Sequence, residues 1–111
     1  MGIPVINDNI HPDELGKLMD NATHAANFLK ALGHEGRLMI LCHLATGEKS
    51  VTELETLLSS RQSAVSQQLS RLRLEGLVSP RRNGKTIYYR LTDERSRQIL
   101  DIVYDLFCAT N

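Results

Sequence analysis

Hydrophobic side chains recur along much of the chain at the three- and four-residue spacing of amphipathic helices. A first helix is predicted from Asp13, and Gly33 interrupts it. A second helix is predicted to begin near Glu35 and to end at Gly47. Its apolar face comprises Leu38, Leu41, Cys42 and Ala45.

The middle of the chain carries the sharpest local signals. Ser50 followed by Glu53 forms a capping box, which predicts the start of a short helix. A turn at residues 59–60 separates it from a longer helix that runs from Arg61 to Gly76. Glycine suits that end because it tolerates the positive φ of a helix C-terminus.

The last third of the chain predicts a hairpin and a final helix. Asn83-Gly84 is a strong turn signal and is expected at the hairpin tip. Thr92 is a natural N-cap for the helix that follows. The apolar stripe of that helix comprises Ile99, Ile102, Val103, Leu106 and Phe107.

The longer central helix has two different faces. Val65, Leu69 and Leu72 form an apolar stripe, whereas the opposite face is short, polar and almost free of acid. Such a face can meet base edges and phosphates in a major groove. The predicted DNA-binding residues are Gln62, Ser63, Ser66, Gln67, Gln68, Ser70 and Arg71 on this helix, and Arg81, Arg82 and Lys85 on the hairpin.

The charge distribution favours a nucleic-acid surface in the same segment. The 111-residue chain has no formal net charge, yet residues 61–90 hold seven basic residues and one acidic residue, a net charge of +6. Attraction to phosphates depends on that local field and not on the total. The alternative is that a solvated helix face and a charged hairpin have no ligand.

Several short motifs together resemble the ArsR/SmtB family of winged-helix bacterial repressors. They are Val65-Ser66-Gln67-Gln68-Leu69, Gly76-Leu77-Val78, the hairpin residues Arg82, Gly84 and Tyr88, and an upstream run from Leu29 to Leu41 that includes Arg37. The resemblance implies a mainly α fold with a small β-hairpin wing, a winged helix-turn-helix. Gln68 stands where the family often has histidine, which bears on the operator that is read.

Length and composition place the chain in one domain. We expect residues 1–12 to form a flexible tail and residues 13–111 to form a single DNA-binding domain. Its first and last helices are too apolar for solvent, so we expect them to pack together and across a twofold axis. Such a homodimer places two recognition helices about 34 Å apart and binds double-stranded operator DNA as an inverted repeat. No stretch spans a membrane, and the expected location is cytoplasmic.

The chain has two cysteines, Cys42 and Cys108, and their role is open on spacing alone. In the cytoplasm they are not expected to form a static disulfide. Cysteine is often a small buried hydrophobe, a reading that fits Cys42 better than Cys108, which lies near the chain end. If the second and last helices pack together, the two thiols approach each other.

The resemblance extends to a branch of the family, the SqrR/BigR-like repressors, that senses persulfides through two cysteines. The residues that carry it include the runs 33–44, 71–78, 84–89 and 104–108. The resemblance therefore implies that Cys42 and Cys108 are sensing thiols, that a persulfide or polysulfide is the inducer, and that sulfide-detoxification genes are controlled.

Three alternatives remain at this point. The first is a repressor that responds to arsenite or a thiophilic metal, although the family's Cys-x-Cys site and its Asp/His site are both missing, so no metal ligands are assigned. The second is a thiol redox enzyme, which lacks a Cys-x-x-Cys motif and a Gly-rich phosphate loop. We expect no enzymatic activity and no cofactor. The third is an architectural DNA-binding protein without an inducer.

Overall fold

The computed structural model describes residues 11–59 and 62–108, without the side chains of Gln62 and Ser63. The fold is mainly helical with one small antiparallel sheet, as expected. The elements are α1 (Pro12–Leu32), α2 (Glu35–Ala45), β1 (Lys49–Ser50), α3 (Val51–Leu58), α4 (Gln62–Leu74), β2 (Val78–Asn83), β3 (Thr86–Leu91), α5 (Glu94–Val103) and the π-helical turn η1 (Tyr104–Cys108). Most of the expected tail, residues 1–10, lies outside the described residues.

Side chains cap both ends of α1, and one of them comes from α2. Helix α1 begins one residue before the expected start, and the Nδ1 atom of His11 accepts a hydrogen bond from the N–H of Asp13 at 3.2 Å. At the other end of α1, Arg37 of α2 donates from Nε to the carbonyl oxygen of Ala31 at 2.7 Å. Because this carbonyl has no partner within the helix, Arg37 fixes the angle between α1 and α2.

The helix-turn-helix follows from local sequence. Ser50 Oγ accepts from the N–H of Glu53 at 3.0 Å, and a carboxylate oxygen of Glu53 accepts from the N–H of Ser50 at 2.9 Å. The predicted capping box is therefore confirmed. Ser59 ends α3 in the left-handed conformation with φ 51°. The apolar stripe of α4 is fully buried.

The hairpin forms as expected, with its tip shifted by one residue. Asn83 pairs with Thr86, so the two turn residues are Gly84 and Lys85, and the expected tip at Asn83-Gly84 is wrong by one position. Gly84 has φ +64°, which suits glycine at the first position of a tight hairpin turn. The sheet also contains β1, which was not expected and pairs with the other edge of β3.

The last helix begins one residue later than predicted. The side chain of Asp93, and not that of Thr92, caps α5 by accepting from the N–H of Arg95 at 2.9 Å. Thr92 instead donates its hydroxyl to the carbonyl oxygen of Gly76 at 3.0 Å. A tertiary contact at the end of α4 thus takes the residue that local propensity assigns to the cap.

One hydrophobic core holds these elements together. Its largest fully buried side chains come from α2, α3, α4 and the residues just before β2; they are Ile40, Leu41, Leu44, Leu54, Val65, Leu69, Leu72 and Leu77. Helices α1 and α5 reach this core through Ala31, Leu32 and Leu100. Helix α4, called the reading helix below, and the β2–β3 hairpin, called the wing, are therefore packed on α2, the helix that carries Cys42.

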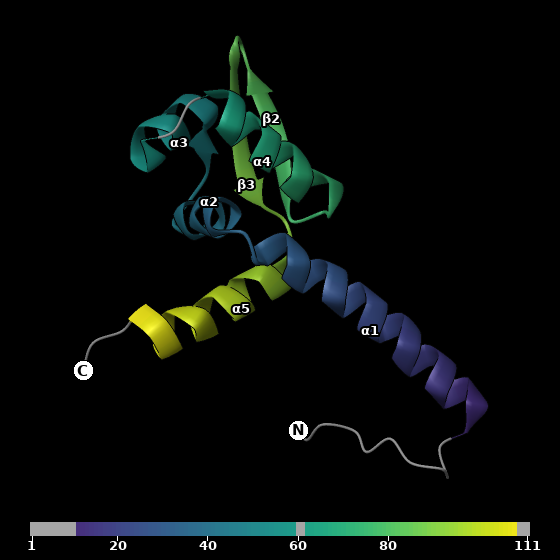
Figure 1. Cartoon of the computed structure of the whole chain (residues 1–111). Coiled ribbons are helices and arrows are strands. Elements are labelled where there is room, and N and C mark those ends of the chain that lie inside the picture. Colours follow the sequence, from purple (N-terminus) through teal and green to yellow (C-terminus); the bar gives the residue numbers. More distant parts are fainter. Residues whose placement is uncertain (1–10, 60–61, 109–111) are drawn as a thin grey trace.

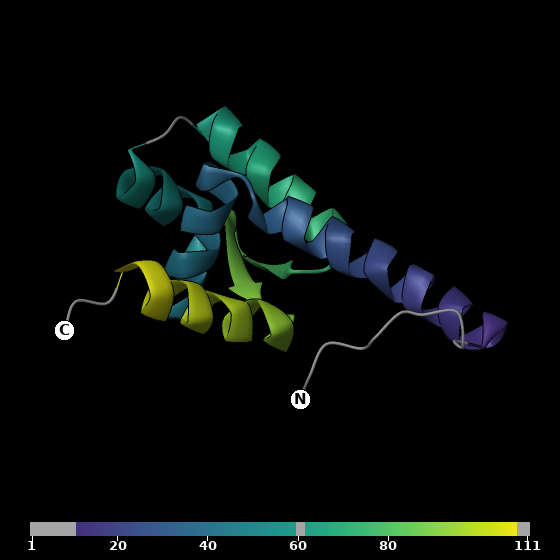
Figure 2. The same ribbon diagram turned by 60° about the horizontal axis from the view of Figure 1, so that its bottom comes forward.

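The two terminal helices leave the body in different directions. Helix α3, helix α4 and the hairpin gather at one end, α5 crosses beneath α2, and α1 projects away from the rest (Figure 1). The second view shows the same projection of α1 (Figure 2). No helix within residues 11–59 and 62–108 has both the length and the apolar character needed to cross a membrane.

Candidate nucleic-acid interface and thiol pair

The polar face of α4 points outward, as its sequence pattern predicts. Gln67, Ser70 and Arg71 are exposed, and Ser66 is half-buried. Arg71 Nε also lies 3.7 Å from Glu75 Oε1, one helical turn away. Ion pairs near the surface are weak, so Arg71 can leave Glu75 for another anion. Gln62 and Ser63 belong to the first turn of α4, but their side chains lie outside the described residues.

Gln68 is placed differently from the rest of the predicted set. Its amide lies so close to Gly36 that a Cβ added there would come within 2.4 Å of its Nε2 atom. Gly36 is the second residue of α2, so the side chain of Gln68 bridges from the reading helix to the start of the cysteine-bearing helix. A pocket beside this contact is lined by Met39, Leu58 and residues 34–36.

One face of the wing carries an arginine that already has partners. Arg81 donates to the Glu48 carboxylate from Nε at 3.1 and 3.2 Å and from Nη2 at 2.6 Å. Its guanidinium carbon also lies 4.9 Å from the centre of the Tyr88 ring. The hydrogen bond from Arg81 holds the pKa of Glu48 below its usual value. Any DNA phosphate must compete with this carboxylate for Arg81.

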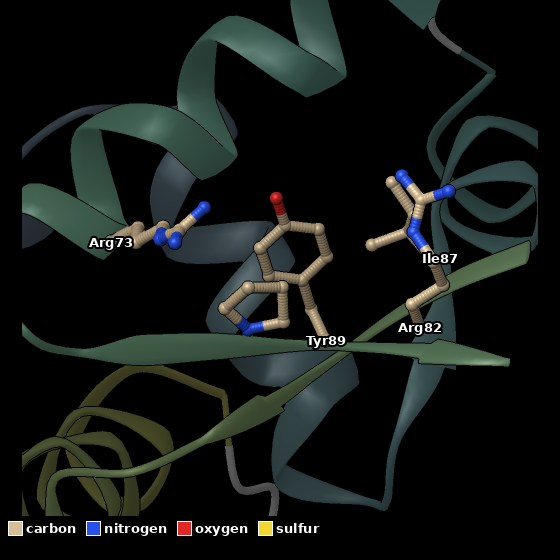
Figure 3. Close-up of a pocket in the computed structure, with 5 residues that line it drawn as sticks. Arg73, Arg82, Ile87 and Tyr89 are labelled. Atoms are coloured by element: carbon tan, nitrogen blue, oxygen red, sulfur yellow. The ribbon is translucent and has the colours of Figure 1, made fainter.

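The other face of the wing forms a groove against α4. Pro80 pairs with Tyr89 and Arg82 pairs with Ile87, so these four side chains share one face of the hairpin. Together with Arg73 of α4 they line a groove of about 310 Å³. The Tyr89 ring stands between Arg73 and Arg82, with its hydroxyl directed away from the strands (Figure 3).

Neither Arg73 nor Tyr89 is in the DNA-binding set predicted from the sequence, and neither is Glu48. The alternation of residues 80, 82, 87 and 89 is a signal that identifies the groove face once the strand register is known. The predicted residue Lys85 is exposed in the hairpin turn. The structure therefore brings Arg82 and Lys85 to the wing surface while it pairs Arg81 with Glu48.

The two cysteines are both free and exposed. Cys42 lies on α2 beside the buried Leu41, so it does not belong to the buried face on which the sequence placed it. Cys108 ends η1, which continues α5, and α5 contacts α2. Partial burial raises the pKa of the Cys42 thiol, and the negative charge of the Cys108 thiolate raises it further.

A metal centre has little support among the described residues. No group of three or more histidine, cysteine, aspartate or glutamate side chains is placed to hold a metal ion in residues 11–59 and 62–108. His43 follows Cys42 directly on α2 and is half-buried. The two cysteines are the only thiol ligands in the sequence.

Comparisons with known proteins agree on one family. The family model described as "Bacterial regulatory protein, arsR family" matches residues 34–79. The biofilm growth-associated repressor of Agrobacterium fabrum is 48% identical over 88 residues, which cover 79% of this chain and 75% of that protein. The transcriptional activator HlyU of Vibrio cholerae is 38% identical over 90% of this chain and 93% of that protein.

Two solved structures extend the agreement to the fold. The transcriptional repressor BigR from Xylella fastidiosa matches with a TM-score of 0.79 at 44% identity, over 86% of this chain and 97% of that chain. Reduced HlyU from Vibrio cholerae matches with a TM-score of 0.80 at 38% identity, over 84% of this chain and 98% of that chain.

Proposed function

The chain belongs to the arsR family of bacterial regulatory proteins, in its BigR-like branch, and on that premise we propose that it is a dithiol-based transcriptional repressor. Its dimer binds operator DNA while Cys42 and Cys108 are reduced and releases it when a persulfide bridges them. Its relatives are transcriptional regulators and not enzymes, in agreement with the expectation from the sequence.

Repression is favoured over activation by the pattern of similarity. Two relatives described as repressors are 48% and 44% identical to this chain, whereas the relative described as an activator is 38% identical. A repressor acts by occupying its operator. The relevant question is therefore what makes the protein leave DNA.

Dimerisation is supported by the exposed apolar side chains of the terminal helices. Leu106 is 72% exposed and Phe107 is 81% exposed on η1, and Met19 and Leu29 are exposed on α1. A 21-residue helix that buries only its last two residues needs a partner to remain folded. A second copy of the chain provides one, and the two reading helices then address an inverted repeat.

The observation that carries the sensing role is the thiol pair. The only two cysteines of the sequence are both exposed. Cys42 lies on α2, which contacts α5, and Cys108 ends the turn η1 that continues α5. Structural cysteines are usually buried and inert, whereas sensing thiols must meet a reagent from solvent. Exposure of both thiols therefore favours chemistry over packing.

The proposed reaction is a sequence of two displacements. One cysteine thiolate attacks the outer sulfur of a persulfide RSSH, which releases RSH and leaves a cysteine persulfide. The second thiolate attacks the cysteine sulfur of that persulfide and displaces hydrogen sulfide, which completes a disulfide. When both thiols carry an extra sulfur, the same displacement leaves a trisulfide. The two thiols are oxidised and the sulfane sulfur is reduced.

A bridge between α2 and η1 acts on DNA binding through the core. Helix α2 packs directly on α3 and α4, so a shift of α2 moves the reading helix. The coupling needs only about 1.4 kcal/mol to change DNA affinity tenfold. Because the proposed inducer is a persulfide, we propose that the regulated genes serve sulfide detoxification.

The test compares the reduced protein with Cys42→Ser, Cys108→Ser and the double variant. All four should bind operator DNA alike, and only the parent protein should release it on treatment with glutathione persulfide. Mass spectrometry should then find Cys42 and Cys108 in one cross-linked peptide. A double serine variant that still releases DNA refutes the thiol mechanism. Absorbance titration with arsenite or Zn²⁺ separates the metal-responsive alternative, which predicts stoichiometric thiolate-to-metal bands.

A further inference from the structure

The arginines of this protein divide sharply by whether they have a partner. Among the arginines with described side chains, Arg37, Arg71, Arg81, Arg90, Arg95 and Arg97 each hydrogen bond or ion pair within the chain. Arg73 and Arg82 alone in that described set have no such partner. Both line the groove between α4 and the wing.

The strand register explains why the two faces of the wing differ. Arg81 and Arg90 lie on the face that holds Tyr88 and Ser79, and each contacts a neighbour there. Arg82 lies on the opposite face with Tyr89, where no acidic side chain lines the groove. Arg73 of α4 lines the same groove, so two arginines without an acidic partner flank the Tyr89 hydroxyl.

We propose that Arg73, Arg82 and the Tyr89 hydroxyl form a binding site for one backbone phosphate of the operator DNA. This inference rests on the proposed function, because it assigns part of the same DNA surface. The chemistry is that of a phosphate monoanion, for which guanidinium groups are favoured donors and a phenol hydroxyl adds a neutral one. The groove has apolar walls at Pro80 and Ile87, which limit competition by water.

The position of the site gives it a specific role. It joins the reading helix to the wing, so one phosphate held there fixes the distance between the element in the major groove and the hairpin beside it. Phosphate contacts set the register of a protein on DNA without reading sequence. The site therefore positions the polar face of α4 and contributes equally to operator and unrelated duplex DNA.

The test is the salt dependence of DNA binding by Arg73→Gln/Arg82→Gln in the full-length dimer. A dimer has two grooves, and each phosphate contact contributes about 0.9 to the slope of log affinity against log salt, so the slope should fall by about 2. Affinity should fall about tenfold per groove, by the same factor for operator and unrelated DNA. Tyr89→Phe should weaken binding about threefold without changing the slope, because it removes a neutral donor.

Arg90→Gln is the matched control, since it removes an arginine from the same hairpin on the other face and should leave the slope unchanged. A neutral methylphosphonate placed at each operator phosphate in turn should, at one position per half-site, abolish the difference between parent and double variant. An unchanged slope in a double variant that binds DNA overturns the phosphate site alone. A parent protein that binds no duplex DNA overturns the proposed function itself.

A second experiment distinguishes a phosphate of the DNA backbone from a free phosphate compound. Inorganic phosphate is titrated into the protein–DNA complex against chloride of matched ionic strength. Equal effects of the two salts support a site that takes the DNA backbone. The opposite outcome has two parts: inorganic phosphate displaces DNA from the parent protein more than chloride does, and the double variant loses this effect while its salt slope stays unchanged. That outcome assigns the groove to a free phosphate compound and overturns the proposal.

Discussion

Glu48 and Arg81 are joined by a two-pronged ion pair, with Nη2 of the arginine 2.6 Å from a carboxylate oxygen 33 positions earlier in the chain. Glu48 lies just before β1, which pairs with β3, so the added strand brings an acid to the wing. One of the basic residues that the sequence assigns to DNA is therefore partly neutralised before DNA arrives.

Replacing Glu48 with Gln should strengthen DNA binding. The amide keeps the size of the side chain but removes the negative charge, so Arg81 becomes available to a phosphate. We expect a severalfold gain in affinity at low salt and a steeper salt slope, by about 0.9 for each freed arginine. Glu94→Gln removes the same charge from the start of α5, outside the β2–β3 hairpin, and is the control. Equal gains in both variants would indicate a general charge effect.

The reactivity of Cys42 should depend on pH above the neutral range. Burial and the Cys108 thiolate raise the pKa of Cys42 above its ordinary value of 9.0, so little thiolate is present at pH 7. Alkylation of Cys42 by iodoacetamide should therefore accelerate about tenfold per pH unit up to at least pH 9. Mass spectrometry of the Cys42 peptide after brief treatment at each pH measures this rate.

Changing the neighbour separates the two causes of that shift. Cys108→Ser removes the like charge and should lower the pKa of Cys42, whereas Cys108→Asp restores a negative charge and should raise it again. The measurement is the midpoint of the alkylation rate against pH at the Cys42 peptide. Identical midpoints in the serine and aspartate variants would mean that the two thiols do not interact.

Gly36→Ala should disturb the contact between α2 and α4. The added methyl group meets the Gln68 amide, which must swing away from α2 and out of its present position. We expect DNA affinity to change with little loss of stability, because the displaced group is the end of a flexible side chain. In a Gln68→Ala background the same change should have almost no effect on affinity. Additive effects of the two substitutions would contradict this contact.

Two buried serines should respond to alanine in opposite directions. Ser50 completes the capping box, so Ser50→Ala should lower the free energy of unfolding by about 1 kcal/mol. The fully buried Ser96 hydroxyl has no hydrogen-bond partner among the described residues, and Ser96→Ala should be neutral or stabilise by up to about 1 kcal/mol. Thermal unfolding of the two variants and the parent protein measures both. A large loss in Ser96→Ala would reveal an ordered partner for its hydroxyl.

Local sequence signals were sufficient for the helices and the wing but not for their contacts. The capping box at Ser50 and the interruption at Gly33 depend on adjacent residues, and both are confirmed. The cap of α5 and the hairpin tip were each displaced by one residue, because Thr92 bonds to Gly76 and strand pairing sets the turn.

The candidate site shows the same division in a stronger form. The outward face of α4 follows from helical spacing, so Gln67 and Ser70 were placed correctly on the surface. The exposure of Cys42 and the pairing of Glu48 with Arg81 depend on elements far apart in the chain. No spacing rule within one helix or strand contains that information.

The π-helical turn at the end of α5 gives Cys108 a different structural setting from that of Cys42. Cys42 is anchored in the interior of α2 next to buried leucine, whereas Cys108 occupies the final position of a wider, rarer kind of coil. Rewinding that coil by a single residue would swing the thiol through about 100°. If the two thiols are bridged as proposed, a change in the winding of this turn would therefore reposition Cys108 while Cys42 stays in place on α2.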